Sequence, residues 1–305
     1  LDYRIAYARY LWASGKRKTA YKSAKKAIEM NPNHVGALYV AGRYAAYQMS
    51  RYLEGERVDY SYDSFGNPSV RGYSLEQFGE QDRDEAIGYL TRALNVDADH
   101  RPSLLLLGLV YYEARMPDKL VVLFKDYLTR HPDDSDAYFF LGLGYQAQDD
   151  LDRAYPSYVK GLERMNLRQR QFMMSVFMLA GKEDIKEAMA MPDEAAIRAF
   201  WTGRDPLFLT PVNERLMEHC GRVAYANLRF GDPEREIPGW STDKGQAYIR
   251  YGRPVARSVR PAEIDTGIDE PMWYQAHLAW VNSQGTMPFE YHPRTEFWDY
   301  GSFRL

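Results

Sequence analysis

The residue pair best suited to chemistry in this sequence is His219 with Cys220, a base next to a thiol nucleophile. The surrounding residues predict a helix, in which neighbouring side chains point about 100° apart rather than at each other. Cys220 is therefore expected to be a small, buried packing residue. Because it is the only cysteine, the sequence excludes an internal disulfide, a CxxC redox pair and a four-cysteine zinc site.

Metal and phosphate sites have no complete signature either. The six histidines form no HExxH motif, and three of them fall in predicted turns: His34, His100 and His131. Asp133, Asp134 and Asp136 suggest a calcium loop, but its twelfth position is Gly144 and not glutamate. A GxGxxA pattern at 142–147 lies inside a predicted helix and not after a strand. We therefore expect no metal, no cofactor and no catalytic residue.

The elements that would position any site begin with an internal period of 34 residues. Leu107-Gly108 recurs as Leu141-Gly142, and Ala8 recurs as Gly42. Proline follows the second helix of a unit, as at Pro132, and ends it because it has no N–H. The pattern resembles the tetratricopeptide repeat (TPR), two helices joined by a tight turn. Four units cover residues 1–166, and the resemblance implies an all-α solenoid.

The second unit contains an insertion near 51–81. Ala20 and Ala86 are 66 residues apart, which is one period plus 32 residues. Loops of this length tend to be functional or disordered, but the insertion is rich in tyrosine, which argues against a floppy linker. Three interpretations stay open: a hairpin that caps the edge of the solenoid, a partner-binding loop that uses Tyr60, Tyr62 and Phe65, or a catalytic role.

A helical solenoid exposes a concave face lined by one stripe of each first helix. By resemblance to the family, the stripe contains Ile5, Arg9, Trp12, Tyr39, Arg43, Tyr47, Leu105, Leu109, Tyr112, Phe139, Leu143 and Gln146. Aromatic residues and arginine are enriched at protein interfaces. The predicted partner-binding residues of the stripe are therefore Arg9, Trp12, Tyr39, Arg43, Tyr47, Tyr112 and Phe139. The best-known groove of the family clamps a C-terminal carboxylate with lysine and asparagine, which this stripe lacks. The alternative is that several of these side chains pack between helices or against a second domain.

The sequence pattern of the second half of the chain differs from that of the repeats. Residues 167–191 continue as a helical linker, and Pro192 opens a new helix. Thr210-Pro211 marks the start of the next helix, which ends near Gly231. Strands are predicted beyond it at 247–251, 272–274, 278–281 and 295–298. The predicted fold class is therefore α+β, with an all-α TPR solenoid at 1–166 and a smaller α+β domain at 192–305.

The sequence Gly239-Trp240-Ser241-Thr242-Asp243 resembles the signature of the GWxTD domain, a bacterial domain often found behind TPR units. The match extends over roughly 195–254 and includes Phe200-Trp201 and Tyr225-Ala226-Asn227. Arg253 departs from it, at a position where we expect a small residue or proline. The family has no reaction to carry over. The resemblance implies a protein of the bacterial cell envelope, periplasmic or exported, as a lipoprotein or a subunit of a surface assembly.

The residue types of this motif indicate a structural role. Gly239 allows a sharp turn, Trp240 supplies a large apolar plug, and Ser241, Thr242 or Asp243 can cap a helical turn. Asp243 could instead pair with an arginine, namely Arg204, Arg222 or Arg250. A binding role and a catalytic role are the alternatives for this motif.

Composition excludes two classes of partner. The formal net charge of −3 argues against a nucleic-acid binder driven by counterion release. The longest mostly apolar stretch, 172–180, is far shorter than a bilayer span, so no transmembrane segment is expected. The chain begins with Leu1, and we expect any signal peptide or lipid anchor to belong to a missing N-terminal segment.

The sequence thus predicts a non-enzymatic scaffold that binds other proteins in a cell-envelope complex through its groove, its insertion or both. One alternative is a carbohydrate-binding module or hydrolase in the C-terminal domain, with Trp240, Trp273, Trp280 or Trp298 as stacking platforms. The 42 acidic residues leave a catalytic carboxylate pair open, because sequence spacing does not give distance. Another alternative is a self-assembling homo-oligomer, since solenoids with exposed ends can stack.

Overall fold

The structure, a computed structural model, describes residues 2–53, 60–62, 68–70, 75–174, 199–203, 205, 211–260, 263–265, 290–292, 295–303 and 305. The chain divides into two compact units, Leu1–Gly252 and Arg253–Leu305. None of the described helices combines the length and the hydropathy of a membrane span.

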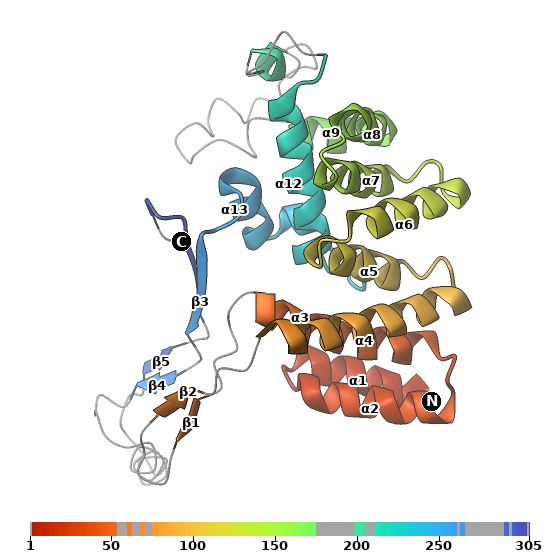
Figure 1. Ribbon diagram of the computed structural model, residues 1–305, viewed down its shortest axis with the longest axis vertical. Helices are drawn as coiled ribbons and strands as arrows, with labels where there is room; N and C mark the ends of the chain where they lie inside the picture. Colours follow the sequence, from red (N-terminus) through yellow and green to blue (C-terminus); the bar gives the residue numbers. More distant parts are fainter. Residues whose placement is uncertain are drawn as a thin grey trace. The chain divides into compact units, whose positions relative to one another are not determined.

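Within the described part of the larger unit, helices stack in successive pairs (Figure 1). The pairs are α1 (Asp2–Ala13) with α2 (Arg17–Met30), α3 (Val35–Leu53) with α4 (Leu75–Val96), α5 (Arg101–Glu113) with α6 (Pro117–Arg130), and α7 (Ser135–Ala147) with α8 (Leu151–Arg164). The short helix α9 (Leu167–Met174) follows them. Each first helix also packs on the second helix of the preceding pair. This arrangement confirms the all-α solenoid that the 34-residue period predicts.

A glycine facing a bulky side chain sets the approach of the two helices in three of these pairs. The facing residues are Gly42 with Leu90, Gly108 with Phe124, and Gly142 with Tyr158. A Cβ added at any of the three glycines would lie 2.7 to 2.8 Å from the opposing side chain. The equivalent residues of the first pair, Ala8 and Ala24, are both fully buried. In those three pairs the period therefore reflects a packing rule, in which a small residue on one helix receives the large residue of its partner, whereas the first pair has a small residue on both helices.

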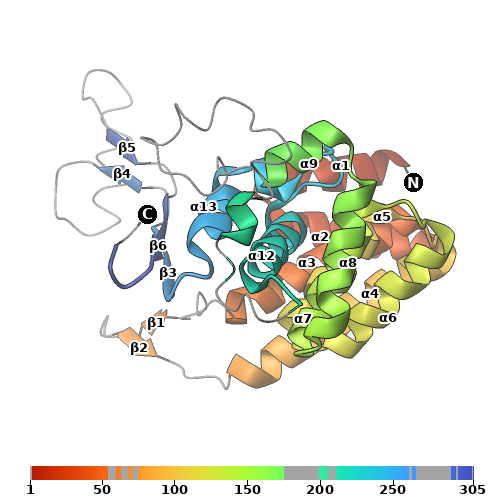
Figure 2. The ribbon, with the colours of Figure 1, turned by 90° about the horizontal axis from the view of Figure 1, so that it is seen from above.

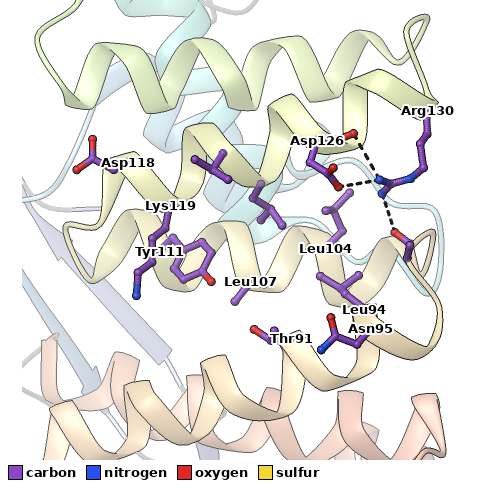
Figure 3. A pocket seen from close by; sticks show the side chains of 13 residues that line it. Thr91, Leu94, Asn95, Leu104, Leu107, Tyr111, Asp118, Lys119, Asp126 and Arg130 are labelled. Carbon is purple, nitrogen blue, oxygen red and sulfur yellow. Dashed lines mark hydrogen bonds and ion pairs between the residues drawn. The ribbon is translucent and has the colours of Figure 1, made fainter.

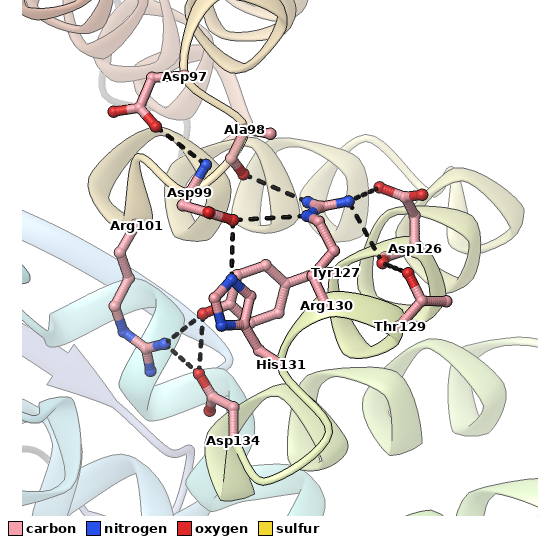
Figure 4. Close-up of polar contacts among 10 residues, drawn as sticks. All are labelled: Asp97, Ala98, Asp99, Arg101, Asp126, Tyr127, Thr129, Arg130, His131 and Asp134. Atoms are coloured by element: carbon pink, nitrogen blue, oxygen red, sulfur yellow. Dashed lines mark hydrogen bonds and ion pairs between the residues drawn. The ribbon is translucent and has the colours of Figure 1, made fainter.

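Polar side chains join the turns at one edge of the solenoid (Figure 4). Asp134 begins α7 by accepting a hydrogen bond from the Ala137 amide at 3.0 Å, and its carboxylate also pairs with Arg101. His131 Nε2 lies 2.8 Å from Asp99 Oδ1 on the neighbouring turn. The acids that resemble a calcium loop thus cap a helix and join turns. Among the described residues, no group of three or more His, Cys, Asp or Glu side chains could hold a metal ion.

The insertion contains a short hairpin between α3 and α4. Strands β1 (Tyr60–Tyr62) and β2 (Pro68–Val70) pair antiparallel, with Tyr60 opposite Val70. Helix α4 begins at Leu75, so the last residues of the insertion are helical. Phe65 lies outside the described residues, and the roles proposed for Tyr60 and Tyr62 stay predictions.

Helix α12 (Glu214–Phe230) returns to the repeats and packs against α5, α7 and α8 (Figures 1 and 2). We call the side of the solenoid that α12 covers the inner face. A tight turn at 231–238, the 3₁₀ helix η2 (Gly239–Ser241) and helix α13 (Asp243–Tyr251) follow. The predicted boundary near residue 192 falls in a stretch, 175–198, outside the described residues, so the division into a solenoid, a linker and a separate C-terminal domain stays a prediction.

The strand predicted at 247–251 is wrong, because this segment is the second half of α13. Thr242 caps the helix, and the buried residues Gly245 and Ile249 are one helical turn apart on its inward side. Gly252 ends it with a φ of 79°, in the left-handed region that favours glycine. Five alternating residues do not distinguish a strand from an amphipathic helix of this length.

The smaller unit contains antiparallel strand pairs. Strand β3 (Ala256–Arg260) pairs with β6 (Thr295–Asp299), and β4 (Glu263–Asp265) pairs with β5 (Glu290–His292). The chain end folds back on β6, where the backbones of Trp298 and Leu305 exchange two hydrogen bonds of 2.9 Å. Strand β6 covers the predicted strand at 295–298, and the strands predicted at 272–274 and 278–281 lie outside the described residues. A complete α+β domain at 192–305 stays a prediction.

Candidate functional site

Arginine side chains pack against aromatic rings where α1, α2 and α3 meet. The guanidinium carbon of Arg17 lies 4.2 Å from the ring centre of Tyr47 and 5.7 Å from that of Trp12. Arg43 lies 4.7 Å from the ring centre of Trp12, and the rings of Trp12 and Tyr47 meet edge to face. These distances are within the range of cation–π attraction. With Arg9 and with Arg51, which lies 5.9 Å from the Tyr47 ring, these residues form what we call the arginine–aromatic cluster.

Helical spacing explains how the cluster assembles. Arg9 and Trp12 are three residues apart on α1, and Arg43 and Tyr47 are four apart on α3, so each pair shares one helix face. Arg17 is the first residue of α2 and reaches the cluster through the turn at Gly15, whose φ is 79°. Because only the first helix of each unit is expected to line the groove, the sequence pattern did not indicate Arg17.

A glutamate from the far end of the unit binds two of these arginines. Oε2 of Glu234 lies 2.8 Å from Arg43 Nη1, and its Oε1 lies 3.0 Å from Arg9 Nε. The side chains of Glu234 and Arg43 are only 21% and 25% exposed, whereas Arg9 is 49% exposed. The carboxylate is thus held at a partly desolvated position by a charge-assisted hydrogen bond from Arg43 and an ion pair with Arg9.

The turn that carries Glu234 is closed by its own hydrogen bonds. The backbones of Asp232 and Ile237 exchange two bonds, of 2.9 and 3.0 Å. The Glu234 amide also donates to Asp232 Oδ1 at 3.1 Å, an arrangement typical of aspartate in turns. Glu234 therefore stands at the tip of a preformed turn. The dipeptide Asp232-Pro233 is a sequence signal for that turn, but nothing in the sequence indicates the partner of Glu234.

Helix α12 occupies the inner face beyond this cluster. Its Tyr225 donates a hydrogen bond of 3.2 Å to Glu113 and lies 5.4 Å, ring to ring, from Tyr112. Arg229 Nε lies 3.3 Å from the same carboxylate, and both charged side chains are more than four-fifths buried. Burial raises the pKa of Tyr225 above its usual value. Tyr112, predicted to bind a partner, thus contacts a helix of its own chain.

The predicted groove residues therefore fall into two groups. Tyr39 and Phe139 are 2% and 1% exposed, so the packing alternative describes them in this structure. Ile5, Leu109 and Leu143 are buried as well. Arg9, Trp12, Arg43 and Tyr47 retain accessible surface and lie together. That these four bind a partner stays a prediction.

A cavity of about 170 Å³ adjoins the arginine–aromatic cluster. Its lining includes Trp12, Arg43 and Tyr47 of the cluster, together with Arg229 and Pro233. Apolar residues of α5 complete the lining, among them Leu105, Leu109 and Val110. The cavity thus combines an apolar wall with cationic and aromatic groups, a composition typical of binding sites.

The GWSTD sequence fixes the turn against α12. A Cβ on Gly239 would lie 1.9 Å from the carbonyl oxygen of Ala226, so only glycine fits there. The Trp240 amide donates to Asn227 Oδ1 at 3.1 Å. The Thr242 hydroxyl donates to the Gly239 carbonyl at 2.7 Å and accepts from the Gly245 amide at 3.1 Å. These contacts determine where the preceding turn, with Glu234, meets the cluster.

Arg222, one of the three arginines expected to pair with Asp243, has other partners. Arg222 forms an ion pair with Glu218 and donates to the carbonyl oxygens of Ile249 and Arg250 at 3.1 Å each. Asp243 makes no ion pair within the described part of the chain, and Arg204 lies outside it. Asp243 instead occupies the first turn of α13, where an acid favours the helix dipole.

The histidine–cysteine pair is buried in the helix core. Cys220 is 1% exposed, and burial raises the pKa of its thiol. His219 Nε2 donates to the carbonyl oxygen of Met173 at 2.8 Å, and burial lowers its pKa to about 4. Neutral, enclosed side chains of this kind have the environment of packing residues.

The tryptophans considered as sugar platforms are not all available. Trp298 is only 5% exposed, so it offers no open face in this structure. Trp240 is half-buried against the main core. Trp273 and Trp280 lie outside the described residues.

A second hollow lies on the other side of the solenoid, between α4 and α6 (Figure 3). Its volume is about 490 Å³, with Leu104, Leu107 and Tyr111 of α5 among its lining residues. The corresponding space between α2 and α4 is bridged by hydrogen bonds from Tyr21 to Glu85 and from Lys25 to Tyr89. One repeat later, these positions hold Ile87 with Lys119 and Thr91 with Leu123. Neither of these pairs can form the same bridge, so the hollow stays open.

No protein-family model matches the chain, and no curated protein matches it. Among solved structures, the TPR protein TTC0263 of Thermus thermophilus is 21% identical, with 53% of this chain and 72% of that chain covered and a TM-score of 0.38. MamA from Desulfovibrio magneticus RS-1 is 15% identical, with 67% and 96% covered and a TM-score of 0.40. YrrB, titled a TPR protein with an unusual peptide-binding site, is 18% identical, with 55% and 87% covered and a TM-score of 0.28. At TM-scores below 0.5, we draw nothing about function from these similarities.

Proposed function

We propose that this chain is a non-enzymatic scaffold that binds partner proteins on its inner face. The observation that carries the proposal is the arginine–aromatic cluster, where Trp12, Tyr47 and Arg43 lie half-exposed beside an open cavity. Tryptophan, tyrosine and arginine are enriched among the few residues that dominate the binding energy of protein interfaces. Since α12 covers the inner face over α5, α7 and α8, a partner would bind at the end formed by α1 and α3.

The setting of this scaffold is also part of the proposal. The resemblance of residues 239–243 to the GWxTD signature supports an accessory subunit of a bacterial cell-envelope assembly, periplasmic or associated with the outer membrane. The contacts of Gly239 and Thr242 support a structural role for that motif, because Gly239 packs on α12 and Thr242 joins Gly239 to the start of α13.

Site-specific photocross-linking tests the scaffold function. A photoreactive phenylalanine analogue replaces Tyr47 in the cluster, and in a matched control it replaces Val96, which is 48% exposed at the end of α4. We expect one or a few partner proteins to cross-link in the native cells from position 47 and not from position 96. Equal cross-linking at the two positions, or none at position 47, would overturn the proposal.

A double substitution, Arg43→Glu with Tyr47→Ala, supplies the second test. It reverses one charge of the cluster and removes one ring, and we expect it to abolish partner capture in a chain that remains folded by circular dichroism. Unchanged capture by the folded double variant would exclude the inner face as the binding surface.

A further inference from the structure

We infer that the arginine–aromatic cluster binds an acidic segment of a partner protein, with one carboxylate on Arg17. This inference rests on the proposed scaffold function and specifies the partner's chemistry. The arginine–aromatic cluster has more positive than negative side chains. The four arginines of the cluster meet the single carboxylate of Glu234, which pairs with Arg9 and Arg43. Within the described part of the chain, Arg17 and Arg51 form no ion pair.

Arg17 is the arginine with unused hydrogen-bonding capacity. Its Nε is buried and has no hydrogen-bond partner among the described residues. Its guanidinium lies over the Tyr47 ring, which restrains the group without satisfying its donors. An unpaired buried donor is unfavourable, and a carboxylate is the acceptor that best matches the planar fork of arginine.

The neighbouring arginines show which ligand this surface accepts. Glu234 already places a carboxylate on Arg43, and Arg43 and Arg17 both lie against the Trp12 ring. A second carboxylate on Arg17 would repeat this interaction at a second arginine beside the same ring. The ion pair between Glu234 and Arg43 is therefore an example, within the chain, of the contact that we propose for the partner.

The surrounding charge favours acidic partners over neutral ones. Residues 1–34, which form the first helix pair, contain eight lysines and arginines and only two acids, although the whole chain has a net charge of −3. Such a local excess of cations attracts acidic segments and raises their rate of association. The cavity beside the cluster adds an apolar wall from Leu105 and Leu109, so the fitting segment alternates acidic and apolar residues.

Fluorescence anisotropy with a labelled hexapeptide of alternating glutamate and leucine tests this inference. The matched probe replaces each glutamate with glutamine. The whole chain is compared with three variants: Arg17→Gln, the charge-matched neighbour Lys18→Gln, and Arg17→Lys, which retains the charge without the planar fork. Lys18 is exposed, so it reports the general effect of removing one charge.

We expect the glutamate peptide to bind and the glutamine peptide not to bind. Arg17→Gln and Arg17→Lys weaken binding at least about tenfold, as expected for a buried charged hydrogen bond. Lys18→Gln weakens it less than about twofold, as expected for an exposed charge. A chemical shift change of the Arg17 Nε–H signal on adding the peptide gives a readout that does not depend on the variants.

Several results would overturn the inference. Equal weakening by Arg17→Gln and Lys18→Gln would show general electrostatic attraction, and equal binding of both peptides would exclude the carboxylate. Displacement of the peptide by a short single-stranded DNA at the same concentration as by unlabelled peptide would make this a general anion site. Cross-linking of a partner at position 47 without any peptide binding would leave the scaffold function standing and refute only the acidic partner. Arg17-dependent peptide binding without cross-linked partners would support the acidic-peptide site and refute the scaffold function.

Discussion

Arg43 and Glu234 are 191 residues apart in the sequence, yet Nη1 of the arginine and Oε2 of the glutamate are separated by only 2.8 Å. This ion pair ties the turn after α12 to the first helices of the solenoid. It also occupies part of the surface that we propose for a partner. The same contact therefore has a structural effect and a competitive one, and the two can be measured separately.

Replacing Glu234 with glutamine should strengthen acidic-peptide binding. The change removes a carboxylate that competes for Arg43 and Arg9, so we expect the peptide affinity to rise about two- to fivefold. The free energy of unfolding should fall by no more than about 1 kcal/mol, because the ion pairs are partly solvated. Glu236→Gln, at an exposed position in the same turn, is the control and should change neither the peptide affinity nor the free energy of unfolding. Unchanged peptide affinity in Glu234→Gln would show that Glu234 does not compete.

Replacing Gly239 with alanine should destabilise the larger unit. The new Cβ would lie 1.9 Å from the Ala226 carbonyl oxygen, a backbone atom that cannot move without displacing α12. We expect a loss of at least about 3 kcal/mol in urea denaturation. In contrast, Gly88→Ala in the middle of α4 meets no atom within 4 Å and should stabilise by about 0.5–1 kcal/mol. A Gly239→Ala chain as stable as the wild type would show that the turn is not packed on α12.

The buried histidine should make stability depend on pH. The pKa of His219 is about 4 in the folded chain against 6.5 for an unperturbed histidine, so protons bind more tightly to the unfolded chain. Its contribution is fully present above pH 6.5 and is lost as the pH falls toward 4, by up to about 3 kcal/mol. His219→Gln, which can still donate to the Met173 carbonyl, should reduce the decline in melting temperature over this pH range. Parallel pH curves for the two proteins would contradict the burial of His219.

Removing the Tyr225 hydroxyl should weaken the attachment of α12. Tyr225→Phe deletes the hydrogen bond to Glu113, a carboxylate that is 12% exposed and also pairs with Arg229. We expect a loss of about 1–2 kcal/mol in the free energy of unfolding. Tyr3→Phe, at a position that is 85% exposed, should leave stability unchanged. Equal stability of the two variants would show that the hydroxyl contributes nothing to packing.

The local pattern of residues was enough to predict the solenoid. The 34-residue period arises from contacts within and between neighbouring helices, such as Gly108 against Phe124, and these contacts join residues close in sequence. The buried state of Cys220 could be predicted in the same way, from its place on a helix. The prediction of a strand at 247–251 was wrong, because five residues carry too little periodicity to distinguish a strand from a helix. The segment belongs to a helix that Thr242 caps.

The helix pairs, and a set of aromatic and arginine residues of the types enriched at interfaces, could be read from the amino-acid pattern alone. Which of these residues are accessible depends on the folded chain, which buries Tyr39 and Phe139 and brings Tyr225 against Tyr112. The folded chain also brings Glu234 to Arg9 and Arg43 and leaves Arg17 without an acid among the described residues. The physical reason is that helix periodicity is a local property, whereas ion pairs and burial depend on how α12 and the following turn return to the repeats.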